Sequence, residues 1–440
     1  TSTVGDTLAV RYDKDRGSTI GDFANIKNLH FYLADGVSGS TPSLLTLNKT
    51  NHKDIRDMNI GVGVSGSART LSVNDTISLM KVAGTGTNTL DMHNPTANKI
   101  KGMQGVSLLY EFELRKRGTN ELVATVTKAT IGDQTKSFVE TKTGATDFIN
   151  QGSDLLTFDG ISIGKKDRVG NKKKNLKGYH LWAATAQSKL RVETGSHVTT
   201  GGYNLAVGWA REDEHAYGST MFSPFVEYGK GNYDSYLDDG THGSGGFSYL
   251  GGGVIGRIDR TDGLFAEAVV HGGKARSDYS GSVYQGTMTT YSSANTYLAA
   301  HMGIGKEIRT NEKDSVSAYL RYYWSRQAGA KARLNSGEEY TFGSVTSSRV
   351  RLGMRYAHTD SEHSAVYAGL GWEYELNGRA QANYAGYNTP VSSLRGGSAL
   401  LEVGYRFAPR DSRFSYDMHV TGWQGKRQGV TGSAHLNWAF

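Results

Sequence analysis

Apolar and polar residues alternate along the last segment of the chain, which reads GVTGSAHLNWAF. Val430, Leu436, Trp438 and the terminal Phe440 fall on one side of this alternation, and residues such as His435 fall on the other. A period of two residues indicates a β-strand with one apolar and one polar face. The pattern therefore predicts a strand that reaches the last residue, and it raises the question of what the apolar face contacts.

The same alternation recurs from Lys177 onward and predicts twelve strands in all. In one of them Arg351 lies between Val350 and Leu352, so charged and apolar side chains point to opposite faces. The expected strands cover residues 178–193, 199–211, 219–233, 245–259, 262–278, 294–309, 313–329, 345–359, 363–377, 395–408, 411–424 and 428–440.

Two all-β folds accommodate such strands: a soluble sandwich with its apolar faces inward, and a barrel in lipid with its apolar face outward. Three features favour the barrel. Residues on the polar side are often Gly or charged, and aromatic residues such as Trp209 and Trp438 stand near strand ends. Tight connections such as DRTDG and APRDS also alternate with long ones such as SDYSGSVYQGTMTTYSSA, as in outer-membrane barrels. We therefore predict a 12-stranded antiparallel outer-membrane β-barrel over residues 178–440.

The first 140 residues have a different composition. All six Trp and all but three of the 25 Tyr lie at or after residue 179. Residues 1–140 instead carry short strand-like runs, such as TISLMKV and GVSLLYEFELR, separated by Asn, Asp and Gly. Short strands with polar corners are typical of a β-solenoid or a small β domain, so we expect a β-helix-like segment here.

Between these parts, residues 141–177 are expected to hold one helix, at about 144–160, and the basic linker KKDRVGNKKKNLK. The helix lies in the stretch GATDFINQGSDLLTFDG, where polar residues three to four positions apart stack on one face. Its polar candidates are Asp147, Asn150, Gln151, Asp154 and Asp159.

The polar face of the predicted barrel is rich in charge. The candidates for the lumen are Arg257, Arg321, Arg349, Arg351, Arg355, Arg406, Glu227, Glu267, Glu373, Glu375 and Glu402. Because a buried unpaired charge is costly, a helix inside the lumen has to match the charges of the wall. Our hypothesis is that the helix carboxylates pair with the Arg cluster on the eighth strand and its neighbours and plug the pore. The alternative is that these charges only line a solvated channel.

Composition excludes several other classes. The chain has no Cys and no apolar run long enough for a transmembrane helix, and its net charge of +7 is scattered rather than gathered on one face. We therefore expect no disulfide scaffold and no nucleic-acid partner. Neither a Ser-centred nucleophile elbow nor HExxH occurs, and the thirteen His are dispersed. We expect no enzyme, no cofactor and no metal site.

Several stretches in this order resemble the autotransporters, the type V secretion family. They include NQGSDLL in the helix, VETGSHVTTGGYNLAVGWA over the first hairpin, SYLGGGVIGRID, and the terminal Phe440. The segment GDFANIKNLHFYLADG resembles the C-terminal part of a passenger that folds as a β-helix stem. In one subgroup the pore helix carries an Asn-Asn self-cleavage site; this chain has Asn150-Gln151 instead, which argues against self-cleavage by that route.

The resemblance implies a barrel that inserts among outer-membrane lipids and exports its own passenger. The helix then remains in the lumen, and the N-terminal stem emerges at the cell surface. Leu436, Trp438 and Phe440 are implied to be a signal for the barrel-assembly machinery, although Phe440 could also be only an interfacial aromatic. A host or cell-surface ligand would be bound by the part of the passenger that lies upstream of residue 1. An outer-membrane barrel enzyme and an open porin are the alternatives.

Overall fold

The computed structural model describes residues 1–13, 16–34, 37, 41–92, 98–157, 179–409 and 412–439. The chain divides into two compact units. Unit 1 comprises Thr1–Thr135 with Arg333–Tyr340 and Asn383–Thr389, and unit 2 comprises Lys136–Ala332, Thr341–Ala382 and Pro390–Phe440. Two short segments from between the barrel strands therefore belong to unit 1.

Unit 1 is a ten-stranded sheet with a separate two-stranded sheet, β6–β9. Within it β2, β4 and β7 pair in parallel, as do β3, β5 and β8, whereas β10, β11, β12 and β8 pair antiparallel. The strands are β1 (Ser2–Val4), β2 (Thr7–Tyr12), β3 (Ser18–Ile20), β4 (Asn28–Leu33), β5 (Leu45–Leu47), β6 (His52–Asp54), β7 (Asn59–Val64), β8 (Thr76–Val82), β9 (Thr89–Asp91), β10 (Lys99–Gln104), β11 (Leu108–Arg117) and β12 (Glu121–Ile131).

The core of unit 1 follows from the alternation of its strands. In β11, Leu108, Tyr110 and Phe112 are fully buried while the residues between them are partly exposed. Parallel pairing stacks equivalent positions of successive strands, so that Val10 of β2 lies beside Phe31 of β4. Stacked apolar rows of this kind form the continuous core of a solenoid.

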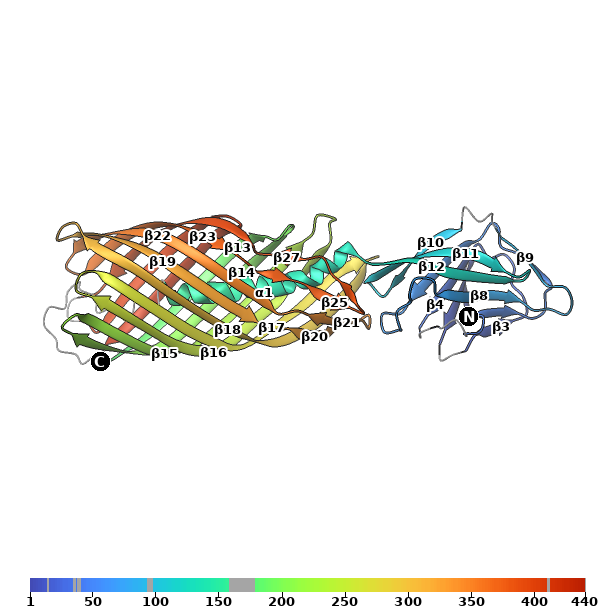
Figure 1. The fold of residues 1–440 in the computed structure, drawn as a ribbon, viewed down its shortest axis with the longest axis horizontal. Helices are drawn as coiled ribbons and strands as arrows, with labels where there is room; N and C mark the ends of the chain where they lie inside the picture. The colour runs from blue at the N-terminus through green and yellow to red at the C-terminus, as the bar shows by residue number, and fades with distance from the viewer. Residues whose placement is uncertain are drawn as a thin grey trace. The chain divides into compact units, whose positions relative to one another are not determined.

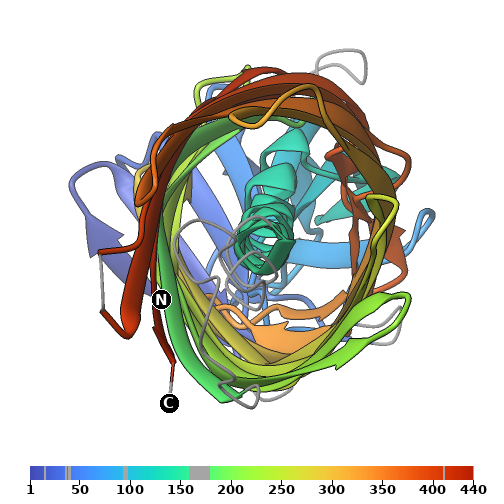
Figure 2. The ribbon, with the colours of Figure 1, turned by 90° about the vertical axis from the view of Figure 1, so that its left-hand side faces the viewer.

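Unit 2 is dominated by a closed barrel of twelve strands, which Figures 1 and 2 show from the side and along its axis. Its strands are β13 (Tyr179–Glu193), β14 (His197–His215), β15 (Gly218–Tyr236), β16 (His242–Arg260), β17 (Leu264–Tyr284), β18 (Thr287–Arg309), β19 (Asp314–Gln327), β22 (Val345–Ser361), β23 (Ser364–Glu375), β28 (Gly396–Phe407), β29 (Phe414–Gly425) and β30 (Arg427–Ala439). All neighbours are antiparallel, and β13 closes the barrel against β30. The predicted 12-stranded antiparallel barrel is confirmed.

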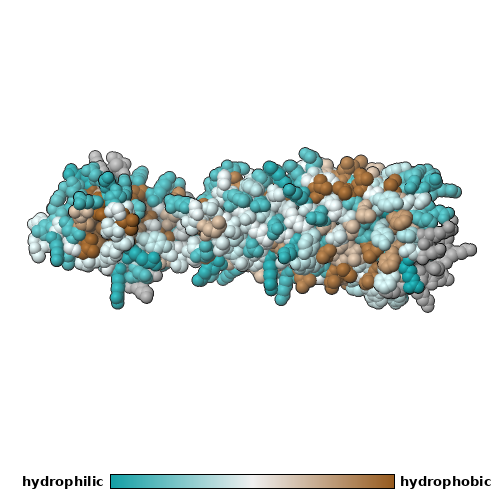
Figure 3. All heavy atoms as spheres, turned by 180° about the vertical axis from the view of Figure 1, so that it is seen from behind, coloured by the Kyte–Doolittle hydropathy of each residue, from teal (hydrophilic) through white to brown (hydrophobic). Residues whose placement is uncertain are grey.

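The alternation of the barrel strands points its apolar face outward. On β22, Arg349 and Arg351 are buried, whereas the intervening Val350 and the following Leu352 are 36% and 60% exposed. Figure 3 shows apolar side chains gathered on the outer wall over one part of the barrel's length. This is the arrangement of a barrel that meets hydrocarbon, with a polar interior.

One of the predicted long loops is a strand hairpin. The sequence predicts a loop between strands 262–278 and 294–309, but β17 and β18 run on to a tight turn at Gln285 and Gly286, whose φ angles are 47° and 70°. The alternation simply continues, because Tyr279 and Tyr291 still point inward and are buried. Other long connections contain short strands: β20 (Ala330–Arg333), β21 (Glu339–Phe342), β24 (Arg379–Ala380), β25 (Ala382–Tyr384), β26 (Tyr387–Asn388) and β27 (Ser392–Ser393).

Helix α1 (Lys136–Leu155) follows the short 3-10 helix η2 (Asp133–Thr135). It begins eight residues before the expected start at 144, inside the segment assigned to the stem, because Phe138 anchors its first turn between Tyr279 and Tyr291 at ring distances of 5.2 and 6.2 Å. Every residue from Ser137 to Leu155 is buried. No described helix is both long and apolar enough to span a membrane.

Candidate functional site

Helix α1 lies inside the barrel, as the view along the barrel axis shows (Figure 2). Lys136, the first residue of the helix, donates from Nζ to the carbonyl oxygen of Thr194 in the β13–β14 turn, at 3.1 Å. Just beyond its other end, Thr157 Oγ1 lies 3.3 Å from Nε2 of His301 on β18. At Gly152 a Cβ atom would lie 2.3 Å from the hydroxyl oxygen of Tyr249, so glycine permits the close approach of helix and wall.

Asp154 of the helix is the centre of a buried ion cluster. Its Oδ1 lies 2.9 Å from Nη1 of Arg349 and 2.6 Å from Nη2 of Arg351, both on β22. Its Oδ2 lies 2.9 Å from Nη1 of Arg427, the first residue of β30. Glu373 on β23 bridges the two β22 guanidinium groups from the wall, at 3.1 and 2.5 Å.

Asp147, two helical turns earlier, completes this cluster. Its Oδ1 accepts hydrogen bonds from Nη2 and Nε of Arg427 at 3.0 and 3.1 Å. Gln151 lies between the two aspartates; it donates to Asp147 at 2.8 Å and accepts from Ser188 of β13. Three arginines thus face three carboxylates, those of Asp147, Asp154 and Glu373, so the buried cluster has no net charge.

Asn150 joins the helix to a different part of the wall. Its Nδ2 donates to Ser347 on β22 at 3.0 Å, and its Oδ1 accepts from Ser325 on β19 at 2.9 Å. Of the five polar helix candidates, the structure therefore brings Asp147, Asn150, Gln151 and Asp154 against the wall. Asp159 lies outside the described residues.

Several of the other predicted lumen charges pair with one another on the wall rather than with the helix. Glu267 accepts from Arg257 at 2.7 Å and from Arg321 at 2.5 Å. Arg355 donates to Glu402 at 2.5 Å.

Two further candidates likewise have partners on the wall. Arg406 donates to Asp417 at 3.1 Å, and Glu375 accepts the backbone N–H of Ser348 at 2.7 Å. Of the eighth-strand cluster, Arg349 and Arg351 meet a helix carboxylate, whereas Arg355 pairs with Glu402 of β28, two strands away. The expectation of a helix partner is therefore wrong for Arg355 within the described residues, because it lies nearer the short-turn end of β22.

Arg427 contacts the helix but is not among the predicted lumen residues. It lies between the expected strands 411–424 and 428–440. Extending the alternation of the last strand backward from His435 gives Ser433, Thr431, Gly429 and then Arg427 on the polar side. That parity is the signal that would have placed its side chain in the lumen.

A buried Ser–His–Glu chain also ties the helix to the wall. Ser153 Oγ lies 3.1 Å from Nε2 of His271, and His271 Nδ1 lies 2.7 Å from Oε1 of Glu227. Tyr297 donates to the same glutamate oxygen at 2.6 Å. Ser153, His271 and Glu227 are only 2–3% exposed. The arrangement therefore satisfies buried polar atoms and does not present the serine hydroxyl to solvent.

Leu436 and Trp438, two of the three C-terminal candidates, lie on the outer side of β30. Trp438 is 36% exposed and stacks on Phe414 of β29 at 5.7 Å between ring centroids. Leu436 pairs in register with Ala183 of β13. Phe440 lies outside the described residues.

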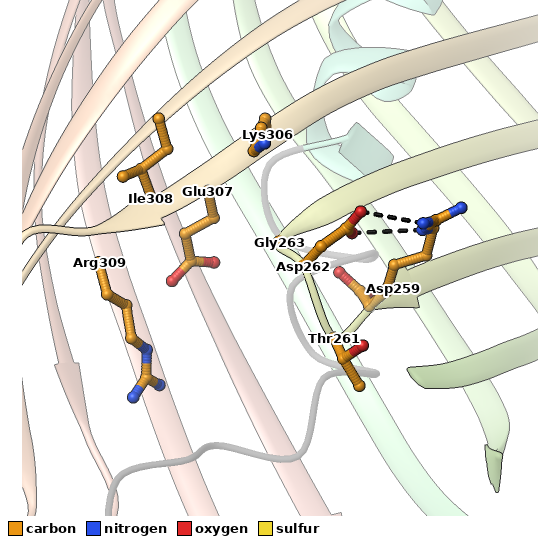
Figure 4. Close-up of a pocket in the computed structure, with 9 residues that line it drawn as sticks. Asp259, Thr261, Asp262, Gly263, Lys306, Glu307, Ile308 and Arg309 are labelled. Carbon is orange, nitrogen blue, oxygen red and sulfur yellow. Dashed lines mark hydrogen bonds and ion pairs between the residues drawn. The ribbon is translucent and has the colours of Figure 1, made fainter. Parts of the chain in front are cut away.

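A cavity of about 280 Å³ opens at the short-turn end of the barrel, between the β16–β17 turn and the end of β18 (Figure 4). Its charges are largely matched: Arg260 pairs with Asp262 at 3.0 Å, and Asp259 pairs with Arg257 at 2.8 Å. Among the residues that the structure describes, no three His, Asp or Glu lie close enough together to hold a metal ion.

The closed barrel with an apolar outer wall and a helix in its lumen defines an outer-membrane transport unit. A family model described as the autotransporter beta-domain matches residues 181–420, more than half of the chain. The chain belongs to the autotransporter family, and its barrel is a translocator domain of the outer membrane.

One solved structure agrees with this assignment at the level of the fold, and a second shows a weaker similarity. The translocator domain of the autotransporter NalP from Neisseria meningitidis is similar with a TM-score of 0.53 and 16% identity, over 69% of this chain and 99% of that one. The transport unit of the autotransporter AIDA-I from Escherichia coli is similar with a TM-score of 0.49 and 11% identity, over 67% and 99% of the two chains. A comparison with curated proteins finds no match.

Proposed function

We propose that this chain exports its own N-terminal passenger through the outer membrane and anchors it at the cell surface, with helix α1 left in the lumen as a plug. The observation that carries the proposal is the neutral cluster of Asp147, Asp154 and Glu373 with three arginines. The charges of the wall match those of the helix. A passing segment of arbitrary sequence would not carry carboxylates at the positions that match the wall arginines. The helix is therefore the segment that stops in the barrel when transport ends.

Single-channel conductance in a planar bilayer tests the plug. Deleting residues 136–155 is expected to raise the conductance several-fold, because it removes a fully buried helix from the pore. The double variant Asp147→Asn/Asp154→Asn should give intermittent openings, while Asp213→Asn, at an exposed ion pair on β14, should not. High conductance of the unaltered chain would support an open porin instead, and unchanged conductance after the deletion would refute the plug.

Surface display is tested by labelling single cysteines, since the chain has none of its own. Val4 in unit 1 is 78% exposed, and Tyr217 in the short β14–β15 turn is 54% exposed. Val4→Cys should react with a membrane-impermeant maleimide on intact cells, and Tyr217→Cys only after the outer membrane is opened. The reverse pattern would overturn the proposed orientation.

The proposed partner of the C-terminal strand is the barrel-assembly machinery, recognised through Leu436, Trp438 and Phe440. Phe440→Ser should reduce insertion into the outer membrane strongly. Phe222→Ser, which removes an outward aromatic that is 57% exposed on β15, should reduce it much less. Equal effects of both variants would leave Phe440 an interfacial aromatic and no more.

A further inference from the structure

The outer wall carries three neighbouring cations on strands β15 and β17. Lys230, Lys274 and Arg276 all point outward and are exposed. In register, Lys230 pairs with Ser248 of β16, and Ser248 pairs with Arg276. With strands about 4.8 Å apart and about 6.8 Å between alternate residues of one strand, the Cα atoms of Lys230 and Arg276 lie about 10 Å apart, and those of the two β17 cations about 7 Å apart.

Among the described residues, these cations lack the ion pair that three outward arginines of the barrel make. Arg191, Arg211 and Arg260 each form an ion pair with a carboxylate two residues further along the chain. Within the described part of the chain, neither Lys230 nor the two cations of β17 make a hydrogen bond or an ion pair. The next outward carboxylate on β17, Asp278, accepts the backbone N–H of Gly246 at 3.1 Å and has no ion pair with these cations in the described residues. Even with its charge counted, the group of three cations keeps a net positive charge.

The strip of wall between these cations is shallow and stands at the border of the apolar zone. Ser248, the outward residue of β16 between Lys230 and Arg276, is small, and so is Gly246, the next outward residue of that strand. On one side follow apolar residues: Leu250 is 65% exposed, and Leu298 of β18 is 50% exposed. On the other side the outward residues are polar, among them Asn232, Asp234, Ser244, Ser280 and Ser292.

We propose that Lys230, Lys274 and Arg276 bind the phosphorylated sugar headgroup of an outer-leaflet glycolipid such as lipid A. Uncompensated ammonium and guanidinium groups are suited to phosphate oxygens, which accept strong charge-assisted hydrogen bonds. The apolar rows that begin at Leu250 take the acyl chains, and the hydroxyl of Ser248 faces the sugar. The choice of the outer leaflet rests on the proposed function, because it requires the long-hairpin end of the barrel to face the cell exterior.

The test uses the full chain in detergent, with bound lipid counted by native mass spectrometry. Bisphosphorylated lipid A is expected to bind the unaltered protein. It should bind the variant K230Q/K274Q/R276Q at least about tenfold more weakly, because several charge-assisted contacts are lost together. The control variant K306Q removes an outward cation near the short-turn end of β18, away from the three cations. It should bind lipid A as the unaltered protein does. Resistance to unfolding by sodium dodecyl sulfate without heating shows that each variant still forms the barrel.

Three results would overturn the proposal. The first is undiminished binding by the triple variant, and the second is equal binding of lipid A from which both phosphates have been removed. The third is displacement of lipid A by equimolar inorganic phosphate or phosphatidylglycerol, which would mean a site for any phosphate. Because the assay needs no membrane orientation, its outcome is separate from the cysteine labelling, which alone decides which leaflet the site faces.

Discussion

Strands β11 of unit 1 and β22 of the barrel have the same alternation and use it in opposite ways. In β11 the apolar residues Leu108, Tyr110 and Phe112 are buried, and the alternate residues Leu109 and Glu111 are partly exposed. In β22 the charged residues Arg349 and Arg351 are buried, and the apolar ones are exposed. The period gives the strand, but the solvent outside decides which face becomes the core.

The two regions therefore depend on different forces. Unit 1 gains stability by removing apolar surface from water. The barrel encloses charges, and each buried charge is tolerable only because its partner is in place. Substitutions that affect one kind of core should have little effect in the other, and the following experiments test this.

The largest effect is expected in the lumen. Asp154→Leu leaves Arg349, Arg351 and Arg427 with too little negative charge, and should destabilise the barrel by about 3–5 kcal/mol. Asp213→Leu breaks only the exposed pair with Arg211 and should cost less than about 1 kcal/mol. Unfolding in urea followed by Trp fluorescence reports the barrel alone, since every Trp lies at or after residue 179. Equal costs for the two variants would contradict a charge-matched lumen.

A matched pair of Leu→Ala variants compares the two cores directly. Leu108 of unit 1 is fully buried, and its truncation should cost about 2–5 kcal/mol, because it leaves a cavity. Leu352 on the outer wall of β22 should cost only about 1–2 kcal/mol, since detergent or lipid fills the space. Hydrogen exchange measured by mass spectrometry resolves the two regions. A larger loss at Leu352 would show that the apolar wall is packed like a core.

Unit 1 contains one buried carboxylate that binds a turn. Glu338, which is fully buried, accepts the backbone N–H of Val106 at 2.6 Å and the hydroxyl of Ser107 at 3.0 Å. Glu338→Ala should cost about 1–3 kcal/mol, because a buried N–H loses its acceptor. Faster hydrogen exchange at Val106 is the expected sign. The neighbouring Glu339→Ala, which loses only an exposed contact with Arg333, should leave that exchange unchanged.

The smallest effect is one of pH. In unit 1, Arg117 at the end of β11 lowers the pKa of Glu121, the first residue of β12, from 4.5 to about 2 through a hydrogen-bonded ion pair. Because the pKa is lower in the folded state, this pair stabilises unit 1 above about pH 4.5, and its contribution is lost as the pH falls towards 2. We expect a loss of about 1 kcal/mol, measured as a lower urea midpoint of unit 1. Glu121→Gln should abolish that part of the pH dependence.

The barrel was predictable because alternation is a local property. Strand number and the outward direction of residues such as Leu352 follow from parity alone. The full length of the β17–β18 hairpin was missed because Ser, Thr and Gly in residues 280–293 resemble a loop in composition, although Tyr279 and Tyr291 keep the period.

The helix and its contacts were harder to predict. The first turns of α1 read KSFVETKT, which has no helical period of apolar residues, and they are held by Phe138 between two tyrosines far along the chain. The partners of Asp154 could be guessed on β22 because two arginines stand there with one residue between them. Arg427 could not be chosen among the many arginines without knowing that β30 closes against β13 and brings its first residue beside the helix.

The pairing of β13 with β30 also fixes the order of events during biogenesis. Thirteen residue pairs, from His180 with Ala439 to Val192 with Arg427, join the first and last barrel strands. The ribosome makes β30 after the other eleven barrel strands, so the ring cannot shut until β30 has been made, and until then two unpaired edges are available to other chains. A nascent or truncated polypeptide of this kind therefore has to be shielded from aggregation on its way to the membrane.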